Sequence, residues 1–361
     1  MKVCFFGSYV KDSYGIPSGN GGILLKKILQ TQNVEIVECH EPMDSIYSFL
    51  SSYIKLWFKH KKIDYDVMLI PWRGILTLPL AKFIHKKPII YFPAFSIFDT
   101  LVHDRKKIKE NSLQSKFVHW VDMLACKWVD KVVLESTEEI NYFINEFNSP
   151  KEKFSQLPLA ADESIFVPLP FKEPKKEFVV LFFGSFIPLH GVETIVKSAV
   201  ILQNQSEILF LICGDGQTKP SMENFVQEKK LKNIQLLGLV SREKLLENIK
   251  NSDVCLGIFG DTNKAKKVVT NKVFQILASQ KPLITMESLT AIESHLINDV
   301  NCVLVPPANP EKLAEVILSL KNNPEKRKQI ASQGYQTYMK NLSMDVVGKR
   351  LVKIIEETLS R

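Results

Sequence analysis

Paired cysteines are missing from this 361-residue sequence. Its six cysteines are scattered, with no C-x-x-C pair and no histidine nearby at metal-ligand spacing. This pattern excludes a disulfide framework and a zinc site of the usual kind. Several of the cysteines lie in apolar runs such as 209–213, where a buried, inert thiol is the ordinary state. We therefore expect a reducing compartment.

Long uninterrupted apolar runs are also missing. The longest, residues 67–84, is broken by two prolines, an arginine and a lysine, so no segment is predicted to span a membrane. The first apolar stretch is interrupted too early for a signal peptide. These features predict a cytoplasmic protein, with peripheral attachment to the inner face of the membrane kept open.

The composition is that of an ordinary globular protein, with 45% hydrophobic and 24% charged residues. It excludes a disordered chain and a collagen-like repeat, and the length favours two domains. The net charge of +8 divides into +2 for residues 1–170 and +6 for residues 171–361. The second half is therefore the better candidate for binding an anion, with general surface solubility as the alternative.

Short apolar runs alternate with longer amphipathic ones throughout the chain. Strands are predicted at 3–6, 35–38, 67–70, 89–92, 131–134, 178–183, 208–213, 234–237, 254–257, 282–285 and 302–305. The alternation with helices implies right-handed βαβ units and parallel sheets. Prolines and charges at 166–176 predict an exposed linker between two doubly wound, Rossmann-like halves. If the halves face each other, the ligand is expected in the cleft between them, at the carboxyl ends of the strands.

Two glycine-rich loops follow strands of the second half. Residues 183–192, FGSFIPLHGV, lead into a helix whose unpaired N–H groups suit an anion. Residues 213–217, CGDGQ, allow close approach of the backbone to a ligand. Neither contains the G-x-G-x-x-G fingerprint of dinucleotide binding. An ordinary structural turn explains each loop equally well.

A third loop in the second half is rich in lysine. It runs from a buried strand through Gly257 and three lysines to a helix that begins at Thr270 or Asn271 and carries a fourth lysine, Lys272. Lysines near a helix N-terminus are unfavourable for the helix itself, because the helix dipole prefers anions there. Lysines, turn amides and a helix end together suit a diphosphate, and a solvated basic face is the alternative.

These motifs together resemble those of retaining, family-4-type glycosyltransferases of the GT-B superfamily. One subgroup reads F-G-x-F-I-P-L-H-G, G-I-F-G-D-T-x-K-A and P-N-K-V-x-E, which correspond here to residues 183–191, 257–265 and 270–275. Residues 6–9, 96–105 and 160–162 are similar to the same subgroup. The resemblance implies an acceptor-side domain over 1–168, a nucleotide-sugar domain over 169–342, and a C-terminal helix, 343–361, that crosses back to the first domain.

The resemblance also implies the ligands and the site. The donor is a UDP- or GDP-linked sugar acting as co-substrate, with no other cofactor and no metal, and the acceptor is a glycan or lipid-linked molecule rather than a nucleic acid. The donor-binding residues would be Gly184, Ser185, His190, Gly191, Asp215, Gly216, Phe259, Gly260, Asp261, Lys264, Lys267, Asn271, Lys272 and Gln275. The acceptor-side residues would be Gly7, Ser8, Tyr14, Asp99, Thr100 and Arg105.

The implied reaction transfers a hexose-type unit. The departing diphosphate gains negative charge, so cations and helix-end amides stabilise it most in the transition state, and Lys264 is the expected catalytic cation. Retention implies attack on the same face, with the leaving phosphate helping to deprotonate the acceptor. Asp99 and Asp104 are the alternative bases, although a cap or ion-pair role explains each of them as well.

The chain departs from the family pattern. Relatives place an arginine and a lysine in the first loop, where this chain has Ser185 and His190. Two glutamates eight residues apart in relatives fall here on Lys267 and Gln275. A neutral Gln275 would weaken ribose binding by roughly 1–2 kcal/mol. Two further departures are Thr270, in place of a proline, and Gln280, in place of a glycine.

Two other functions stay open beside the transferase. The departures are compatible with a catalytically silent nucleotide-sugar-binding protein, and the same architecture supports nucleotide-sugar epimerases or hydrolases. A possible membrane partner comes from residues 57–62, WFKHKK, which close an amphipathic helix with aromatic and cationic side chains. Such a patch suits an anionic membrane surface, with helix solvation as the alternative.

Overall fold

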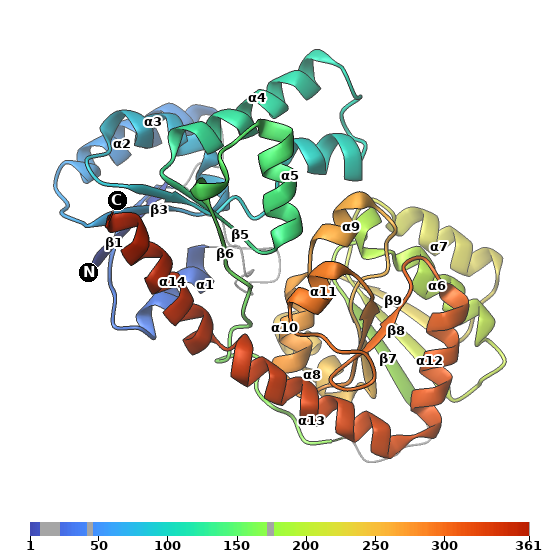
Figure 1. Cartoon of the computed structure of the whole chain (residues 1–361). Helices are drawn as coiled ribbons and strands as arrows, with labels where there is room; N and C mark the ends of the chain where they lie inside the picture. The colour runs from blue at the N-terminus through green and yellow to red at the C-terminus, as the bar shows by residue number, and fades with distance from the viewer. Residues whose placement is uncertain (8–21, 42–45, 172–176, 361) are drawn as a thin grey trace. The chain divides into compact units, whose positions relative to one another are not determined.

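The structure is a computed structural model of the chain and describes residues 1–7, 22–41, 46–171 and 177–360 (Figure 1). The chain forms two compact units, the first made of Met1–Leu159 with Met344–Arg361 and the second of Ala160–Ser343. Within the described ranges, no helix combines the length and the apolar content that a membrane crossing needs.

The first unit is built on a six-stranded parallel sheet with the order β2-β1-β3-β4-β5-β6. Its strands are β1 (Lys2–Gly7), β2 (Glu35–His40), β3 (Val67–Ile70), β4 (Ile89–Tyr91), β5 (Lys131–Leu134) and β6 (Phe154–Gln156). All four residues of β3 are buried, because helices cover both faces of the sheet. This double burial explains why the central strands are continuous apolar runs in the sequence.

The helices of the first unit form two layers. They are α1 (Gly22–Gln30), α2 (Ile46–His60), α3 (Leu78–Ile84), α4 (Leu113–Trp128), α5 (Thr137–Phe147) and α14 (Met344–Leu359), with the 3-10 turns η1 (Trp72–Thr77) and η3 (Lys151–Lys153) and the π-helical turn η2 (Asp99–Asp104). Helices α2, α3, α4 and α5 pack side by side in that order, and α14 packs on α1 (Figure 1). The last helix of the chain therefore belongs to the first unit, as predicted.

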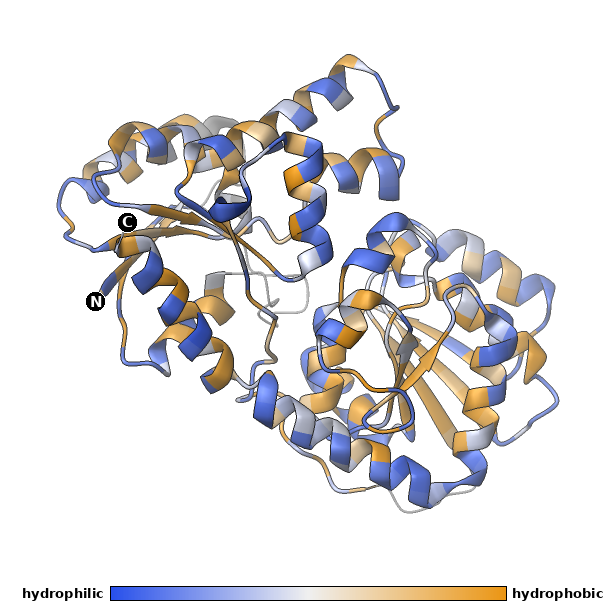
Figure 2. Cartoon of the chain, viewed as in Figure 1, coloured by the Kyte–Doolittle hydropathy of each residue, from blue (hydrophilic) through white to orange (hydrophobic). Residues whose placement is uncertain are grey.

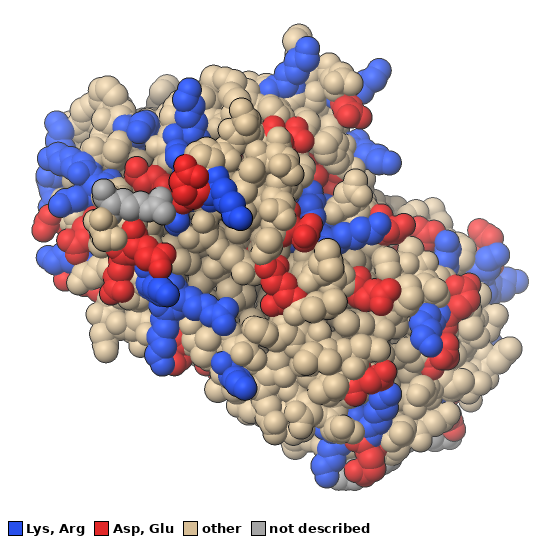
Figure 3. All heavy atoms as spheres, viewed as in Figure 1, with Lys and Arg blue, Asp and Glu red and all other residues tan. Residues whose placement is uncertain are grey.

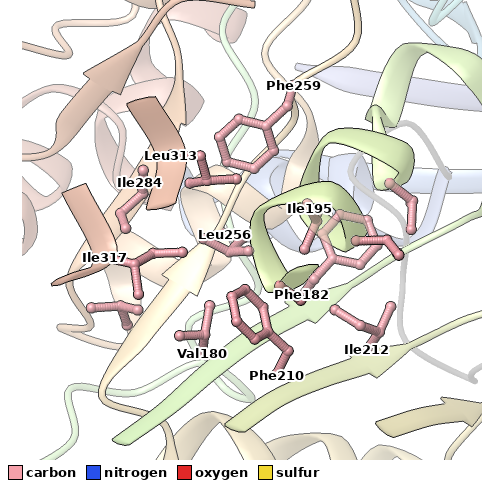
Figure 4. Packing of buried hydrophobic residues seen from close by; sticks show 14 of the residues in the cluster. Val180, Phe182, Ile195, Phe210, Ile212, Leu256, Phe259, Ile284, Leu313 and Ile317 are labelled. Atoms are coloured by element: carbon pink, nitrogen blue, oxygen red, sulfur yellow. The ribbon is translucent and has the colours of Figure 1, made fainter. Parts of the chain in front are cut away.

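The second unit has its own six-stranded parallel sheet, with the order β12-β11-β10-β7-β8-β9. Its strands are β7 (Phe178–Phe183), β8 (Ile208–Cys213), β9 (Ile234–Gly238), β10 (Val254–Leu256), β11 (Leu283–Met286) and β12 (Val303–Val305). Figure 4 shows Val180 and Phe182 of β7, Phe210 of β8 and Leu256 of β10 in one packed core. Burial of these side chains removes a large apolar area from water and stabilises the sheet.

Helices surround the second sheet as well. They are α6 (Val192–Ile201), α7 (Lys219–Glu228), α8 (Arg242–Asn251), α9 (Asn263–Lys267), α10 (Asn271–Ala278), α11 (Leu289–Glu293), α12 (Pro310–Asn322) and α13 (Pro324–Asn341), with the 3-10 turn η4 (Pro188–His190). In both units the strands are hydrophobic, while the outer faces of most helices are hydrophilic (Figure 2). The predicted pair of doubly wound, Rossmann-like domains is thus confirmed.

Seven short elements escaped the sequence prediction: β6, η1, η2, η3, η4, α9 and α11. Each has three to six residues, too few to show a full period of hydrophobic and polar positions.

The chain also enters the second unit ahead of the proline-rich stretch. The N–H of Ala161 already donates to the Tyr338 hydroxyl at 3.2 Å, inside that unit. The expected ligand cleft between the halves stays a prediction.

Candidate functional site

Three loops of the second unit meet at the carboxyl ends of adjacent strands. They follow β7, β8 and β10, which are neighbours in the sheet. The N–H of Gly184 donates to the Cys213 carbonyl at 2.9 Å, and the N–H of Phe259 donates to the His190 carbonyl at 3.1 Å. The sheet topology thus assembles the three loops that the sequence singled out, at the usual ligand edge of such folds.

Two glycines in these loops are required by close approach of neighbouring atoms. Gly191 has a φ of 63°, and a Cβ at this position would lie 2.3 Å from the carbonyl carbon of Phe259. Gly184 has a φ of 148°, and a Cβ there would lie 2.6 Å from Nζ of Lys272. Any other residue would strain the backbone and displace its neighbours. The first loop is therefore held against both the third loop and the start of α10.

Lys272 is an unusual charged residue of this site. It lies in the first turn of α10 and its side chain is buried, with 5% exposure. Its Nζ lies 4.0 Å from the centre of the Phe182 ring and makes no hydrogen bond. Burial holds the pKa of Lys272 well below its ordinary value. A buried amine without a hydrogen-bond partner is costly, and an anion beside Gly184 would satisfy it.

The two residues before Lys272 show the same feature. Oγ1 of Thr270 and Oδ1 of Asn271 are buried and have no hydrogen-bond partner in the structure. Thr270 is the N-cap residue of α10, yet its side chain does not cap the helix. Two of these groups, the Thr270 hydroxyl and the Lys272 amine, can donate to an anion at a helix N-terminus, where the helix dipole favours one, whereas Oδ1 of Asn271 is an acceptor. Thr270 was missing from the predicted donor-binding set, although its place before a helix was a usable signal.

The other lysines of the third loop differ in their environments. Lys264 is buried in α9, whereas Lys267 at the end of that helix is half-buried. Lys266 is exposed, and its Nζ lies 2.7 Å from Oδ1 of Asp261. Lys266 and Asp261 therefore form an exposed ion pair, whereas Lys264 lies in a buried environment.

The first loop places His190 against the core. Its ring is buried, packs edge-on against Phe182, and its Nδ1 hydrogen-bonds the Ser185 carbonyl. A Cβ at Gly184 would lie 3.2 Å from Cε1 of His190, so this ring and the Lys272 amine both lie close to the same backbone position. The Ser185 side chain is exposed beside them.

Four further residues of the predicted donor-binding set occupy different positions. Asp215 and Gly216 are exposed after β8, and Asp215 faces Lys219 at 3.9 Å. Gln275 is half-buried, one turn along α10 from Asn271, so both side chains lie on the same side of that helix. Gly260 packs against the backbone of the first loop.

Phe259, one of the predicted donor-binding residues, faces the core. Its side chain is completely buried among core residues (Figure 4). Its N–H and carbonyl are both used, the first by His190 and the second by the N–H of Ala308 at 2.9 Å. The residue therefore anchors the third loop to the core and presents no group to a ligand in this structure.

The predicted acceptor-side residues of the first unit gather at η2. Asp99, Thr100 and Asp104 are buried there, and Arg105 is half-buried at its end. The Thr100 hydroxyl donates to the Ser96 carbonyl at 2.6 Å. Gly7 ends β1. Ser8 and Tyr14 lie outside the described residues.

A buried hydrogen-bond cluster underlies this turn, and the sequence prediction missed it. The Ser96 hydroxyl donates to Oδ2 of Asp122 at 2.7 Å and accepts the N–H of Asp99 at 3.0 Å. Nδ1 of His103 lies 3.6 Å from Oδ1 of Asp99. The backbone of Asp99 is thus held by Ser96, and its carboxylate lies beside His103.

Across the described ranges, no three His, Cys, Asp or Glu side chains are placed to hold a metal ion. The sequence has an Asp-x-Asp triplet, Asp64–Tyr65–Asp66, but Oδ2 of Asp66 accepts the N–H of Lys2 at 2.7 Å. That contact joins the starts of β3 and β1, at the amino edge of the sheet.

The second unit matches a known protein family. Residues 169–337 match the family described as "Glycosyl transferases group 1". The matched stretch lies within the second unit, Ala160–Ser343. An uncharacterized glycosyltransferase of Methanocaldococcus jannaschii is 27% identical over 49% of this chain and 47% of its own length. The α-D-kanosaminyltransferase of Streptomyces kanamyceticus is 21% identical over 50% of this chain and 45% of its own length. The matches to these curated relatives thus span about half of their length.

Solved structures share the fold of both units. The Anabaena protein HepE, in a complex with UDP-glucose, has a TM-score of 0.72 at 14% identity and covers 99% of this chain and 100% of its own. Sucrose-phosphate synthase from Thermosynechococcus elongatus has a TM-score of 0.74 at 13% identity and covers 100% of this chain and 99% of its own. These likenesses establish the GT-B type of fold with two Rossmann-like domains.

Proposed function

We propose that this protein is a retaining, metal-independent glycosyltransferase that takes a hexose-type unit from a UDP- or GDP-linked donor. The observation that carries the proposal is the start of α10, where Thr270, Asn271 and Lys272 present buried polar atoms without hydrogen-bond partners. A diphosphate beside Gly184 would bind the Lys272 amine, the Thr270 hydroxyl and the free N–H groups of the helix end. The match to group 1 glycosyl transferases supports this assignment.

The proposed reaction follows from the charges at this position. The bond between the sugar C1 and the diphosphate oxygen breaks, and an acceptor oxygen forms a bond to C1 on the same face. The acceptor proton passes to the leaving phosphate, which gains negative charge as it departs. Lys272 and the helix-end amides stabilise that charge more in the transition state than in the bound donor. Lys264, buried in the neighbouring α9, is proposed as a second cation.

The acceptor is proposed to be a glycan or a lipid-linked molecule bound by the first unit near η2. Deprotonation by Asp99 or Asp104 is the alternative to deprotonation by the leaving phosphate. A cytoplasmic location is part of the same proposal. The proposed acceptor, proton acceptor and location are the same whichever sugar or base the donor carries.

Binding measurements test the donor site. Calorimetry with UDP, GDP, uridine and guanosine should show diphosphate binding that Lys272→Met weakens by about 10- to 100-fold, the loss of a charged hydrogen bond. Lys264→Ala should act in the same direction. Lys266→Met is the matched control, because Lys266 is exposed and paired with Asp261, and it should change affinity less than about twofold. An equal loss of nucleoside and diphosphate binding would refute the phosphate role.

A second candidate function is a silent nucleotide-sugar-binding protein, favoured by the neutral Gln275. Incubation with radiolabelled UDP- and GDP-sugars, with and without glycan or lipid-phosphate acceptors, separates the candidates. Transfer to an acceptor supports the transferase, and release of free sugar alone supports a hydrolase. Tight diphosphate binding without either product supports the silent protein.

A further inference from the structure

The helical layer of the first unit exposes a large apolar surface. Eight large apolar side chains on α2, η1, α3 and α4 are between 49% and 87% exposed: Leu50, Ile54, Phe58, Leu76, Phe83, Leu113, Phe117 and Trp120. We call these eight residues the α2–α4 face. Within the part of the chain that the structure describes, every large exposed phenylalanine and tryptophan lies on it. Single exposed apolar residues are ordinary, but a gathered set marks an interaction surface.

Helix α2 shows that these side chains do not belong to the core. Ser52, Leu56 and His60 are buried at four-residue spacing and form the side that packs on the unit. Ile54 and Phe58 lie on the opposite side of the helix, and each is 60% exposed. The fold of the first unit is therefore complete without them.

Contacts link the helices that carry the face. The rings of Trp57 on α2 and Phe83 on α3 lie 5.6 Å apart, centre to centre. The Tyr53 hydroxyl of α2 donates to the Leu76 carbonyl of η1. Helix α3 in turn contacts α4, whose exposed Phe117 and Trp120 rings lie 6.2 Å apart.

Lysines surround this face. Exposed ones follow or flank α2, α3 and α4: Lys55, Lys61, Lys62, Lys82, Lys86, Lys87, Lys106, Lys107, Lys109 and Lys116. Nζ of Lys61 lies 5.3 Å above the Trp57 ring. Asp64 and Glu110 are exposed acidic residues nearby in the sequence, and Glu41 is paired with Lys59 and lies 4.0 Å from Lys55. Figure 3 shows basic side chains gathered at the edge of the first unit, where α2 and α3 lie.

We propose that the α2–α4 face docks on an anionic lipid bilayer. Aromatic rings and apolar side chains would enter the headgroup region, and the surrounding lysines would attract the lipid phosphates. A protein partner fits less well, because lysine is depleted from protein interfaces whereas it is typical of membrane surfaces. The proposal requires no catalytic activity and is independent of the donor site.

Vesicle sedimentation of the full chain tests the docking. The protein should bind vesicles of phosphatidylglycerol mixed with phosphatidylcholine, and should bind vesicles of phosphatidylcholine alone only weakly. This difference in binding should disappear at high salt. The double variant Ile54→Ser, Phe58→Ser should lower the partition coefficient by at least about tenfold. The double variant Lys61→Gln, Lys62→Gln should lower it by about 25-fold, because each lysine near an anionic surface contributes about fivefold.

Matched controls come from the second unit. Leu289→Ser with Ile292→Ser removes two equally exposed apolar side chains from α11, and Lys244→Gln with Lys250→Gln removes two exposed charges from α8. These variants should keep at least half of the binding. Equal losses in the controls, or an unaltered chain that ignores anionic vesicles at low salt, would overturn the proposal. So would a dimer in solution that Phe58→Ser dissociates, because the face would then bind a second copy.

Discussion

Individual lysines of this protein differ in their burial and in their interaction partners, because the fold places them in different environments. Lys266 is half-exposed and paired with Asp261, so solvent and salt screen its charge. Lys272 is buried against Phe182 and has no hydrogen-bond partner. Such a group lowers the stability of the folded chain and is retained where a ligand uses it. The proposed donor site therefore contains a buried amine that lowers the stability of the folded chain.

Lys272→Met is expected to stabilise the protein by about 1–4 kcal/mol while weakening diphosphate binding, because methionine fills the same space without a charge. The folded-state pKa of Lys272 is lowered by burial, so the unfolded chain binds more protons between that pKa and about 10.4. The stability of the unaltered protein should rise with pH through this window. The gain in the variant should therefore be largest at low pH and shrink toward about pH 10.4.

Urea unfolding at several pH values measures this effect. Lys266→Met is the control and should change stability by less than about 0.5 kcal/mol at any pH. A Lys272→Met variant that is less stable than the unaltered protein would show that the amine has a favourable partner.

Gln275→Glu is expected to raise donor affinity by about 5- to 30-fold, because a carboxylate accepts a stronger hydrogen bond from a ribose hydroxyl than an amide does. Affinity for UDP-sugar, measured by calorimetry, checks this. The gain should vanish with a 2′,3′-dideoxy donor. A fall in affinity would mean that Gln275 does not face the ribose.

Among the elements, helix α10 has a distinct feature at each of its ends. Its N-terminus carries the partnerless polar atoms, and its C-terminus closes in a Schellman motif. The N–H of Gln280 donates to the Leu277 carbonyl at 3.0 Å, and that of Lys281 to the Ile276 carbonyl at 3.2 Å. Gln280 has a φ of 54°, in the left-handed region where glycine is favoured. Gln280, which replaces the glycine of the family pattern, therefore strains the backbone locally and does not alter the proposed site.

Gln280→Gly is expected to raise the free energy of unfolding by about 1 kcal/mol, because glycine adopts a positive φ without the clash of a Cβ. Thermal unfolding measures the gain, and donor binding should not change. Gln203→Gly is the control, since Gln203 lies in a turn after α6 without a positive φ and should gain no stability. Equal stabilisation in both variants would contradict the explanation.

At the scale of the molecule, two units with separate cores share one chain. The first unit is completed by α14, which returns from the end of the second unit and packs on α1. A donor bound by the second unit should stabilise only that unit, because a ligand acts on the state that binds it.

Leu351→Ala in α14 is expected to destabilise the first unit by about 2–5 kcal/mol, since this side chain is fully buried. Calorimetric unfolding should then show an earlier transition that UDP leaves in place and a later one that UDP raises. At 100 times the Kd, UDP should add about 2.7 kcal/mol to the second unit. Ile317→Ala, in the core of the second unit, should reverse the order of the two transitions. A single transition that UDP shifts as a whole would show that the units unfold together.

The alternation of apolar strands and amphipathic helices determined most of the fold. Continuous runs such as β7 are specified locally, because a strand buried on both faces must be apolar throughout. The loops that meet at the site could also be predicted, since the carboxyl ends of neighbouring parallel strands lie at one edge. Short elements such as α9 could not, because five residues carry too little periodicity.

Burial and hydrogen bonding, in contrast, were decided by the tertiary structure. The sequence shows four lysines in one loop and helix start, and nothing local distinguishes Lys272 from Lys266. Their difference arises because Phe182 and Gly184, about 90 residues away in the chain, enclose one amine and leave the other in solvent. Phe259 entered the core and Asp99 a buried network for the same reason: the environment of a side chain depends on segments distant in sequence.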